Sequence, residues 1–409
     1  MIHKIVKFSL RNVFRNKRRT LLTISIFVVS FMILALYSGY INNTKKYWKI
    51  SLIHGEYGHL QIASKAFFDD DQYSLDNLIP AEVVKKLSQS LEQLEQVEYF
   101  TTRVFISGFI GNEERSKVFV GSARAASENE DFYYTNPATI GTFYSKDEKY
   151  GVVIGKSLAD ALNVKVNDKL LLMANSALGS LEAIEVQVTG LSKQLIREQE
   201  KVFLILNDEA IEELTFSQGR HNIVILLSDI NETQNVARQL QTIIDENHFP
   251  VELRTLDQLA QLFNQVMDSY QRNYIIALTV LSLIIVLSLI NTMYMSITDR
   301  MREFTTLKTI GISNSIIFLV ILFEGIEIAL FGTAIGAGCA FGISELINAN
   351  MFMMPPPPGT DQSFPLRVML DPPIYGLIGA SLFFISIVAS LVPAYSVLRK
   401  EIQAGFHAS

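Results

Sequence analysis

Long apolar runs alternate with charged breaks along this chain. Four of the runs are about 20 residues or longer, at 20–41, 272–297, 313–347 and 374–398. A helix needs about 20 apolar residues to cross a hydrocarbon core, so each run predicts a transmembrane helix. Between the first two runs, residues 42–271 alternate short β-type runs with helical patterns. The pattern predicts an α-helical membrane protein with four transmembrane helices and a large α/β extracytoplasmic domain between helices 1 and 2.

The charges follow the same division. Residues 42–270 carry 21 Lys and Arg against 33 Asp and Glu, a balance of −12, whereas the rest of the chain carries 14 against 8, a balance of +6. Seven Lys or Arg and no acid precede Leu21. Because short basic segments stay on the cytoplasmic side, both termini are expected there and the large domain is expected in the periplasm. Its acidity argues against nucleic-acid binding.

The first 19 residues predict a cytoplasmic amphipathic helix. Apolar side chains recur from Ile2 to Val13 at helical spacing, and Lys and Arg recur on another face. The alternative is the basic start of a signal peptide. It is disfavoured because the run 20–41 is longer than a usual signal-peptide core and no small-residue cleavage site follows it.

The short break at 298–312 lies between the second and third runs. Its excess of Lys and Arg indicates the cytoplasmic face. It is either a basic loop that only sets topology or a short coupling helix that receives a push from a soluble motor. No Gly or Pro interrupts the sequence from Leu256 to Arg302, which predicts one continuous helix into this break. The residues expected to contact a motor are Asp299, Arg300, Arg302, Glu303, Leu307 and Lys308.

Two carboxylates and four glycines stand out in the third run. Glu324 and Glu327 lie one helical turn apart, and ionisable groups at such depth are costly enough to need a partner or a role. They face a polar cavity or partner helix in a dimer, or reach solvated headgroups, or form a proton or cation relay. Small residues at four-residue spacing predict a close helix-packing face, made of Gly332, Gly336, Gly338 and Gly342.

The loop at 348–373 is expected outside the membrane. It holds seven of the eleven prolines, so it is predicted to be stiff and partly polyproline II. Flexible apolar side chains beside a span suit acyl chains as well as simple anchoring, and here they are Met351, Phe352, Met353 and Met354. The tail 399–409 begins with Arg and Lys, which favours the cytoplasm.

No catalytic or metal-binding pattern is complete in this sequence. The run from Gly151 through Gly155 to Ser157 is one residue short of a phosphate loop, with Tyr150 where a glycine is needed. The six histidines show no metal-ligand spacing, and no G-x-S-x-G occurs. Cys339 is the single cysteine, so no disulfide forms within the chain. We expect no enzyme activity and no cofactor in this chain, so that a separate subunit would hydrolyse any ATP.

Three motifs resemble one family of ABC transporter permeases, the group that includes the lipoprotein-releasing permeases LolC and LolE, the macrolide exporter MacB and the division protein FtsX. Residues 302–311 read R-E-x-x-x-L-K-T-I-G, similar to the family pattern except for Thr309 in place of alanine, and Glu324-Gly325 follows. Residues 154–159 with Asn167-Asp168 are similar to the outer-domain signature, with Asn167 in place of glycine. Pro393-Ala394 is also family-like.

The resemblance implies a subunit that works by mechanotransmission. A dimer of permease chains, alike or paralogous, would dock residues 299–310 on a cytoplasmic ATPase dimer that binds ATP and Mg²⁺, and the outer domain would move in response. The lipoprotein-releasing type is the closest, which implies extraction of lipoproteins or other lipid-linked cargo from the inner membrane, with membrane lipids and a periplasmic acceptor as further partners. The alternatives are a non-transporting transmitter that controls a cell-wall enzyme, as FtsX does, and a MacB-like exporter of a peptide or drug.

Overall fold

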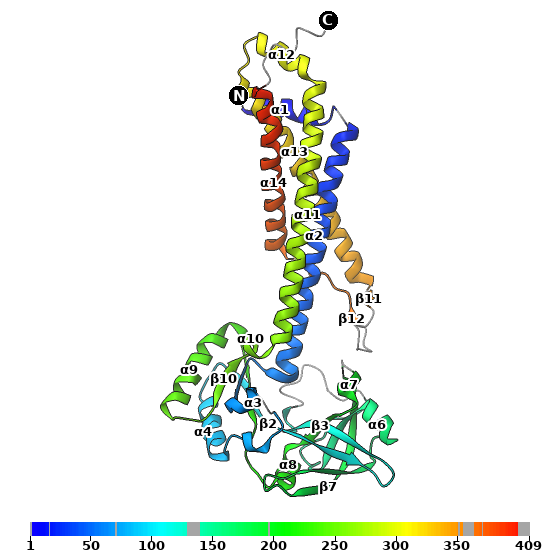
Figure 1. The fold of residues 1–409 in the computed structure, drawn as a ribbon, viewed down its shortest axis with the longest axis vertical. Helices are drawn as coiled ribbons and strands as arrows, with labels where there is room; N and C mark the ends of the chain where they lie inside the picture. Colours follow the sequence, from blue (N-terminus) through cyan, green and yellow to red (C-terminus); the bar gives the residue numbers. More distant parts are fainter. Residues whose placement is uncertain are drawn as a thin grey trace. The chain divides into compact units, whose positions relative to one another are not determined.

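The structure is a computed structural model that separates into two compact units (Figure 1). The helical unit comprises Met1–Lys46, Val266–Met354 and Pro365–Ser409, and the α/β unit comprises Tyr47–Gln265 and Pro355–Phe364. The structure describes residues 2–15, 17–69, 72–128, 140–194, 197–350, 352–354, 364–369 and 371–399.

Four helices are long and apolar enough to cross a membrane: α2 (Lys17–Leu52), α11 (Gln261–Asp299), α13 (Asn314–Asn350) and α14 (Pro372–Arg399). Each extends beyond the predicted apolar run, because helical backbone continues into polar residues that hydropathy excludes. Large apolar side chains such as Leu287 and Phe384 are more than half exposed on them. Such a surface suits lipid better than water.

The predicted continuous helix from Leu256 to Arg302 is wrong at both ends. The short helix α10 (Leu256–Leu259) stops at Ala260, whose ψ of 53° is not helical. The side chain of Asn264 donates to the carbonyl oxygen of Asp257 at 2.6 Å, in place of the next helical amide. At the other end α11 stops before Arg300, which has ψ of 13°. Neither break occurs at Gly or Pro, so the rule that these residues mark helix ends does not predict them.

Helix α2 packs between α11 and α13. The hydroxyls of Thr23 and Thr292 are 2.7 Å apart, and Tyr37 stacks on Tyr274, so α2 and α11 run side by side in opposite directions. On a neighbouring face α2 meets two of the predicted packing glycines. A methyl group at Gly332 would overlap Phe27, and one at Gly336 would overlap Phe31.

The other two predicted packing glycines are placed differently. A methyl group at Gly338 or at Gly342 would meet no atom within 4 Å in the part of the chain that the structure describes. A close contact within this chain is therefore seen for Gly332 and Gly336, and the packing role of Gly338 and Gly342 stays a prediction.

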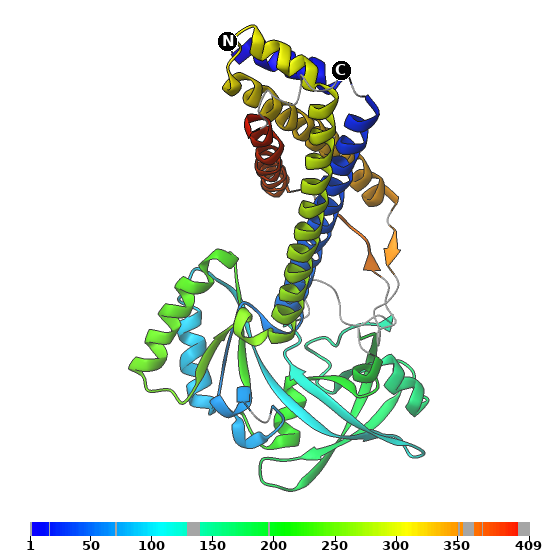
Figure 2. The same cartoon turned by 45° about the horizontal axis from the view of Figure 1, so that its top comes forward.

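One half of the α/β unit is a ferredoxin-like sheet. Its strand order is β10-β1-β9-β2, with all neighbours antiparallel, and helices α4 and α9 supply the two crossovers. Both helices cover the same face of this sheet (Figure 2). The buried core includes Leu60, Leu87, Ile225 and Leu240. The elements are β1 (Leu60–Ala63), α4 (Ala81–Leu91), β2 (Val97–Gly111), β9 (Asn222–Leu227), α9 (Thr233–Glu246) and β10 (Glu252–Thr255).

The other half is a small barrel inserted between β2 and β9. Strand β2 pairs with β9 up to Arg103 and then with β3 from Val104 onwards. The order β2-β3-β8-β5-β7-β6 closes because β6 also pairs with β2. The strands are β3 (Ser116–Arg124), β4 (Ile140–Gly141), β5 (Gly151–Gly155), β6 (Lys169–Asn175), β7 (Leu181–Ser192) and β8 (Phe203–Asn207).

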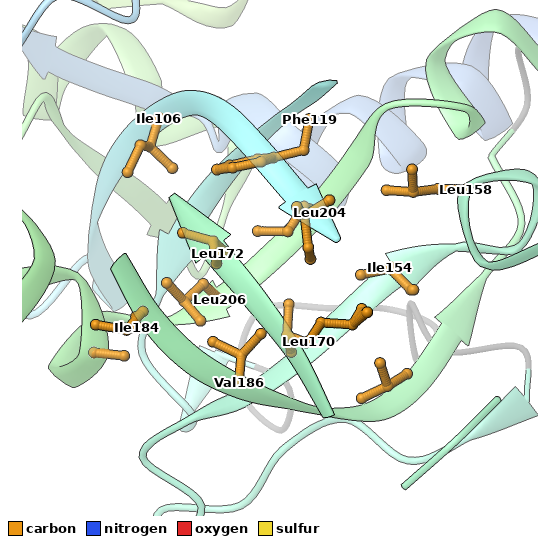
Figure 3. Packing of buried hydrophobic residues seen from close by; sticks show 14 of the residues in the cluster. Ile106, Phe119, Ile154, Leu158, Leu170, Leu172, Ile184, Val186, Leu204 and Leu206 are labelled. Carbon is orange, nitrogen blue, oxygen red and sulfur yellow. The ribbon is translucent and has the colours of Figure 1, made fainter. Parts of the chain in front are cut away.

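Apolar side chains fill the interior of this barrel (Figure 3). Ile106, Phe119, Ile154, Leu204 and Leu206 point toward one another and are at most 3 % exposed. A six-stranded ring is narrow enough for side chains to fill, so the barrel is a packed core and not a channel. Short helices cover parts of this unit: α3 (Lys65–Asp69), α6 (Lys156–Leu162), α7 (Arg197–Glu200) and α8 (Asp208–Thr215).

The glycine-rich turn before α6 holds a carboxylate of the chain itself. Glu200 Oε1 accepts hydrogen bonds from the amide of Ser157 at 2.9 Å and from its hydroxyl at 2.6 Å. The start of α6 is where a phosphate loop would hold phosphate. The amide that would face a phosphate is thus already bonded to Glu200.

The segment around the proline-rich loop is tied to the helical unit where it is described. Asn348 exchanges two hydrogen bonds with the backbone of Val368, at 3.0 and 2.9 Å, and Met369 donates to the carbonyl of Gly39 at 3.1 Å. Two short strands, β11 (Met353–Met354) and β12 (Phe364–Pro365), pair with each other. Met351 and the four consecutive prolines lie outside the described residues.

Candidate functional site at the coupling segment

The break between α11 and α13 folds into a short helix, α12 (Met301–Thr309). It ends in a Schellman turn, in which Ile312 donates to Leu307 at 3.0 Å and Gly311 donates to Lys308 at 3.0 Å. Gly311 has φ of 97°, a conformation that side chains with a Cβ rarely adopt. The glycine that closes the motif at residues 302–311 therefore has a conformational task, which is to turn the chain into α13.

Helix α12 has one anchored face and one open face. Phe304 is 2 % exposed and packs in the core of the helical unit, where Met301 and Leu307 also contact it. Arg302 and Ile310 lie on the exposed side, and Ile310 is 74 % exposed. Arg302 and Ile310 are eight residues apart, so this side of α12 offers a partner one charged and one apolar contact.

Arg300 does not belong to the open face. Its side chain is buried, and Nη1 donates to Glu324 Oε1 at 2.7 Å. Its guanidinium also lies over the ring of Phe304, 4.9 Å from the centroid. In this chain the charge of Arg300 is buried against a carboxylate and away from the surface, and its direct contact with a motor stays a prediction.

Helix α1 (Ile2–Val13) completes the polar cluster around the two glutamates of α13. Asn12 Nδ2 donates to Glu324 Oε1 at 2.9 Å, and the hydroxyl of Ser9 donates to Glu327 Oε1 at 2.6 Å. Ser9 is fully buried. Two polar residues three apart on α1 thus match two carboxylates three apart on α13. None of the three interpretations of the glutamates from the sequence placed their partners within this chain.

Two exposed ion pairs link α12 and the end of α11 to the N-terminal helices. Arg15 Nη1 lies 2.7 Å from Glu303 Oε1, and Arg19 Nη1 lies 2.6 Å from Asp299 Oδ2. These side chains are about half exposed, so the pairs contribute little to stability by themselves. They restrict Asp299 and Glu303 to geometries that face α1 and α2.

A small cavity lies beside the cluster. Its volume is about 20 Å³, room for about one water molecule, and Asn12, Thr20, Ser296 and Glu324 help to line it. Among the described residues, Arg300 Nη2 and Glu327 Oε2 are buried without a hydrogen-bond partner. Buried polar atoms without partners are costly, so small movements that pair them are favourable.

Helix α14 contacts the same stretch of α13. Gly325, next to Glu324, would overlap Ser390 if it carried a methyl group, and Ser386 donates to the carbonyl of Gly325 at 3.1 Å. The Glu-Gly pair of the motif therefore has two tasks in this structure. The glutamate holds Arg300, and the glycine admits α14.

The structure brings the other predicted site residues together only in part. Lys308 and Leu307 are partly buried on α12. Phe352 and Met353 are more than half exposed, 43 or more residues along the chain from α12. The predictions missed Ser9, Asn12, Arg15 and Arg19. The signal for the first two was present, since Ser9 and Asn12 interrupt the apolar side of α1 at helical spacing.

Family models match two parts of the chain. Residues 20–243, more than half of the 409, match the MacB-like periplasmic core domain, and residues 275–402 match the FtsX-like permease C-terminal. The second match contains α12, Arg300 and both glutamates.

The chain is also similar to individual curated proteins. The chain is 25% identical over 218 residues to an uncharacterized ABC transporter permease of Methanocaldococcus jannaschii, covering 51% of this chain and 52% of that one. It is 23% identical over 199 residues to the lipoprotein-releasing system transmembrane protein LolC of Xylella fastidiosa, covering 47% of each. The chain thus spans about half the length of these curated relatives.

A solved structure that is similar to this chain is the periplasmic region of MacB from Actinobacillus actinomycetemcomitans. The identity is 14%, the TM-score is 0.39, and the comparison covers 53% of this chain and 98% of that one. The two family models together extend over most of the sequence, and they include most of the α/β unit, the part of α11 from residue 275 onwards, α13 and α14. The chain therefore belongs to the family of the MacB-like periplasmic core domain and is an ABC transporter permease of the MacB/FtsX/LolC type.

Proposed function

We propose that this chain is the non-catalytic membrane subunit of an ATP-driven complex, and that a separate ATPase dimer with its own ATP and Mg²⁺ docks on α12. The observation that carries the proposal is the two-faced anchoring of α12. The helix is held on its buried side by Phe304 and by the pair Arg300–Glu324. On its other side Arg302 and Ile310 are exposed. A helix anchored in this way moves together with its neighbours when a partner pushes on its open face.

The polar cluster provides the route for that movement. Arg300 stands at the junction of α11 and α12, and its carboxylate partner Glu324 also binds Asn12 of α1. Displacing α12 would therefore pull on α1, α11 and α13 at once. We infer that the unit works by mechanotransmission, in a dimer with a second permease chain.

The orientation in the membrane is part of the proposal. The basic excess of the segments around α1 and α12 and the acidic balance of residues 42–270 favour α12 in the cytoplasm and the α/β unit outside. We therefore propose a bacterial inner membrane, with the α/β unit in the periplasm and both termini inside.

For the cargo we propose lipoproteins, passed to a periplasmic acceptor. The similarity to a protein named as part of a lipoprotein-releasing system supports this, and so do the exposed apolar side chains of Phe352 and Met353 beside α13. A transmitter for a cell-wall enzyme and a peptide or drug exporter differ from it in cargo and not in mechanics.

Docking is tested by reversing the exposed charge on α12. We expect Arg302→Glu to abolish co-purification of the ATPase and the stimulation of ATP hydrolysis by the membrane subunit. The matched control is Arg272→Glu, the same charge change at an exposed position of α11. Its position is 27 residues before Asp299, about 40 Å along the helix. Retention of the ATPase by Arg302→Glu would refute docking at this face.

Cargo is tested by depletion of the protein followed by membrane fractionation. Lipoproteins stranded in the inner membrane are the expected result. Chained cells with normal lipoprotein sorting would refute lipoprotein cargo in favour of the transmitter, and sensitivity to a peptide or drug with normal sorting would refute it in favour of the exporter.

A further inference from the structure

A second cavity lies within the α/β unit. Its volume is about 130 Å³, which is room for a few water molecules or one small oxyanion. Four separate parts of the chain line it: the end of α2, the residue before β1, the start of α9 and the junction of β10 with α10. The polar residues that line it are Lys49, His59, Thr233, Gln234, Thr255 and Asp257.

His59 presents a fixed hydrogen-bond donor to this cavity. The residue is 7 % exposed, and its Nδ1 accepts a hydrogen bond from the amide of Leu227 at 3.0 Å. A neutral imidazole that accepts at Nδ1 carries its proton on Nε2. No residue in the described part of the chain accepts that Nε2 proton. A donor that has no partner among the described residues, on a side chain that lines a cavity, is open to a ligand.

The backbone around His59 holds the ring in place. Its amide donates to Ile225 at 2.8 Å, and its carbonyl accepts from Leu256 at 3.1 Å. The donor is therefore preorganised by β9 on one side and by α10 on the other. A rigid donor loses little entropy when it binds a ligand.

Lys49 supplies the positive charge at the same cavity. Its Nζ lies 3.8 Å from Asp257 Oδ1, which is too long for a hydrogen bond. The Asp257 side chain is 71 % exposed, so it can turn into solvent. The ammonium group can then take an oxyanion in place of the carboxylate.

The lining favours a tetrahedral anion over a planar one. No arginine is among the described residues that line the cavity, so the fork that binds carboxylates in two parallel hydrogen bonds is missing there. The residues that can donate come instead from different elements, namely Lys49, His59 and Gln234. Lysine binds phosphate as a point charge.

We propose that this cavity binds a phosphate group, held by Lys49 and His59. The phosphate comes from a soluble ion or ester, or from a phospholipid headgroup. The predicted first span ends at Ile41. Lys49 comes eight residues later, directly after Trp48 in the sequence. Trp and Lys in that position are typical of the membrane interface. Both a soluble phosphate and a phospholipid headgroup are therefore candidate ligands of the cavity.

The test titrates sodium phosphate into the full-length chain by calorimetry at pH 7 in phosphate-free buffer. The chain is held in nanodiscs of digalactosyl diacylglycerol, an uncharged lipid without phosphate. We expect one saturable site. Lys49→Gln and His59→Asn should each weaken binding about tenfold, since each removes one hydrogen bond to a charged group. Asp257→Asn should strengthen binding, because it removes the competing carboxylate.

The control variants separate site chemistry from net charge and from folding. Lys46→Gln makes the same charge change at an exposed lysine outside the cavity and should leave the affinity unchanged. His59→Asn keeps an acceptor for the amide of Leu227, so its melting temperature reports whether the fold survives. His59→Gln keeps a donor in place of Nε2 and should retain more affinity than His59→Asn.

A second set of nanodiscs identifies the source of the phosphate. In phosphatidylcholine, which is uncharged overall and carries a phosphodiester, a headgroup that occupies the cavity would weaken apparent phosphate binding several-fold. Equal affinity in both lipids supports a soluble ligand. The proposal fails if the wild-type chain shows no saturable binding in either lipid, or if Lys46→Gln weakens binding as much as Lys49→Gln does.

Discussion

Arg300 and Glu324 form a buried ion pair among apolar helices, and neighbouring groups offset part of its desolvation cost. Removing two charges from water costs several kcal/mol per ion, and the cost is offset to the extent that the remaining polar atoms find partners. Here Asn12 adds a second donor to Glu324, and the ring of Phe304 lies under the guanidinium. The pair joins α12 to α13, so its effect extends from two residues to two elements.

Breaking this pair from one side should be strongly destabilising. Arg300→Met leaves Glu324 buried without its cation, and Glu324→Leu leaves Arg300 without its anion. Each should cost roughly 3 to 5 kcal/mol, and the double variant should cost clearly less than the sum. The measurement is a double-mutant cycle by chemical unfolding in detergent. Arg19→Met, which breaks the exposed pair with Asp299, is the control and should cost less than about 1 kcal/mol. Additive effects would exclude a coupled pair.

His59 should make the α/β unit sensitive to acid. The pKa of His59 is lowered from 6.5 to about 4, mainly by burial and also by His54 and Lys49, while Asp229 acts in the opposite direction. Asp257 also faces the cavity that the ring borders. The unfolded chain gains a proton on this ring below about pH 6.5, whereas the folded protein gains it only near pH 4. Stability is therefore lost as the pH falls through this window, by up to about 3 kcal/mol.

The measurement for His59 is chemical unfolding of the wild type and of His59→Asn at pH 7 and at pH 4.5. Asparagine does not titrate and keeps an acceptor for Leu227. The free energy of unfolding of the wild type should therefore fall more steeply with acid than that of the variant. Parallel falls in the two proteins would show that His59 is not the group responsible.

At the scale of elements, α13 is the helix on which the others converge. Gly332 and Gly336 admit α2, Gly325 admits α14, and the two glutamates bind α1 and the junction before α12. The three glycines are seven and four residues apart, so they share one face of α13, and the glutamates lie on another face. A helix that is hydrophobic on all sides gives no sequence signal for which neighbour each side meets.

Enlarging Gly332 should separate α13 from α2. Gly332→Leu would overlap Phe27, and overpacking of this kind costs typically about 1 to 3 kcal/mol. Gly342→Leu is the matched control, since its added side chain meets open space within the described part of the chain. Thermal unfolding in detergent should show a lower midpoint for the first variant and an unchanged midpoint for the second. The reverse order would mean that Gly342 forms the tighter contact.

At the scale of the whole molecule, the division of charge bears on orientation. The α/β unit lies within the acidic stretch, and the coupling segment lies within the basic remainder. Because positive charges near the ends of spans set orientation, the two should lie on opposite sides of the membrane.

Labelling of single cysteines tests this arrangement. In a Cys339→Ser background, Ser180→Cys places a thiol in the exposed turn between β6 and β7, and Thr309→Cys places one at the exposed end of α12. A membrane-impermeant maleimide should label the first variant in intact spheroplasts and the second only after permeabilisation. Labelling in the opposite pattern would invert the proposed topology and remove the basis for docking an ATPase on α12.

Much of the architecture was predictable because hydropathy, helical period and charge are local properties. The four long helices and the α/β domain between α2 and α11 follow from runs of neighbouring residues. The glycine at 311 could be recognised as a helix end for the same reason. The break at Ala260 could not, because a side chain seven residues beyond the acceptor, Asn264, replaces a backbone donor there.

The sequence by itself determined where the chain is apolar and where it is charged, since both depend on a few consecutive side chains. Only the tertiary structure decided that Arg300 is withdrawn from the surface of α12, that Ser9 and Asn12 bind the glutamates of α13, and that the strands inserted after Arg103 close into a barrel. These contacts join residues that are far apart in the chain. Their free energy depends on burial and geometry, which no local pattern contains.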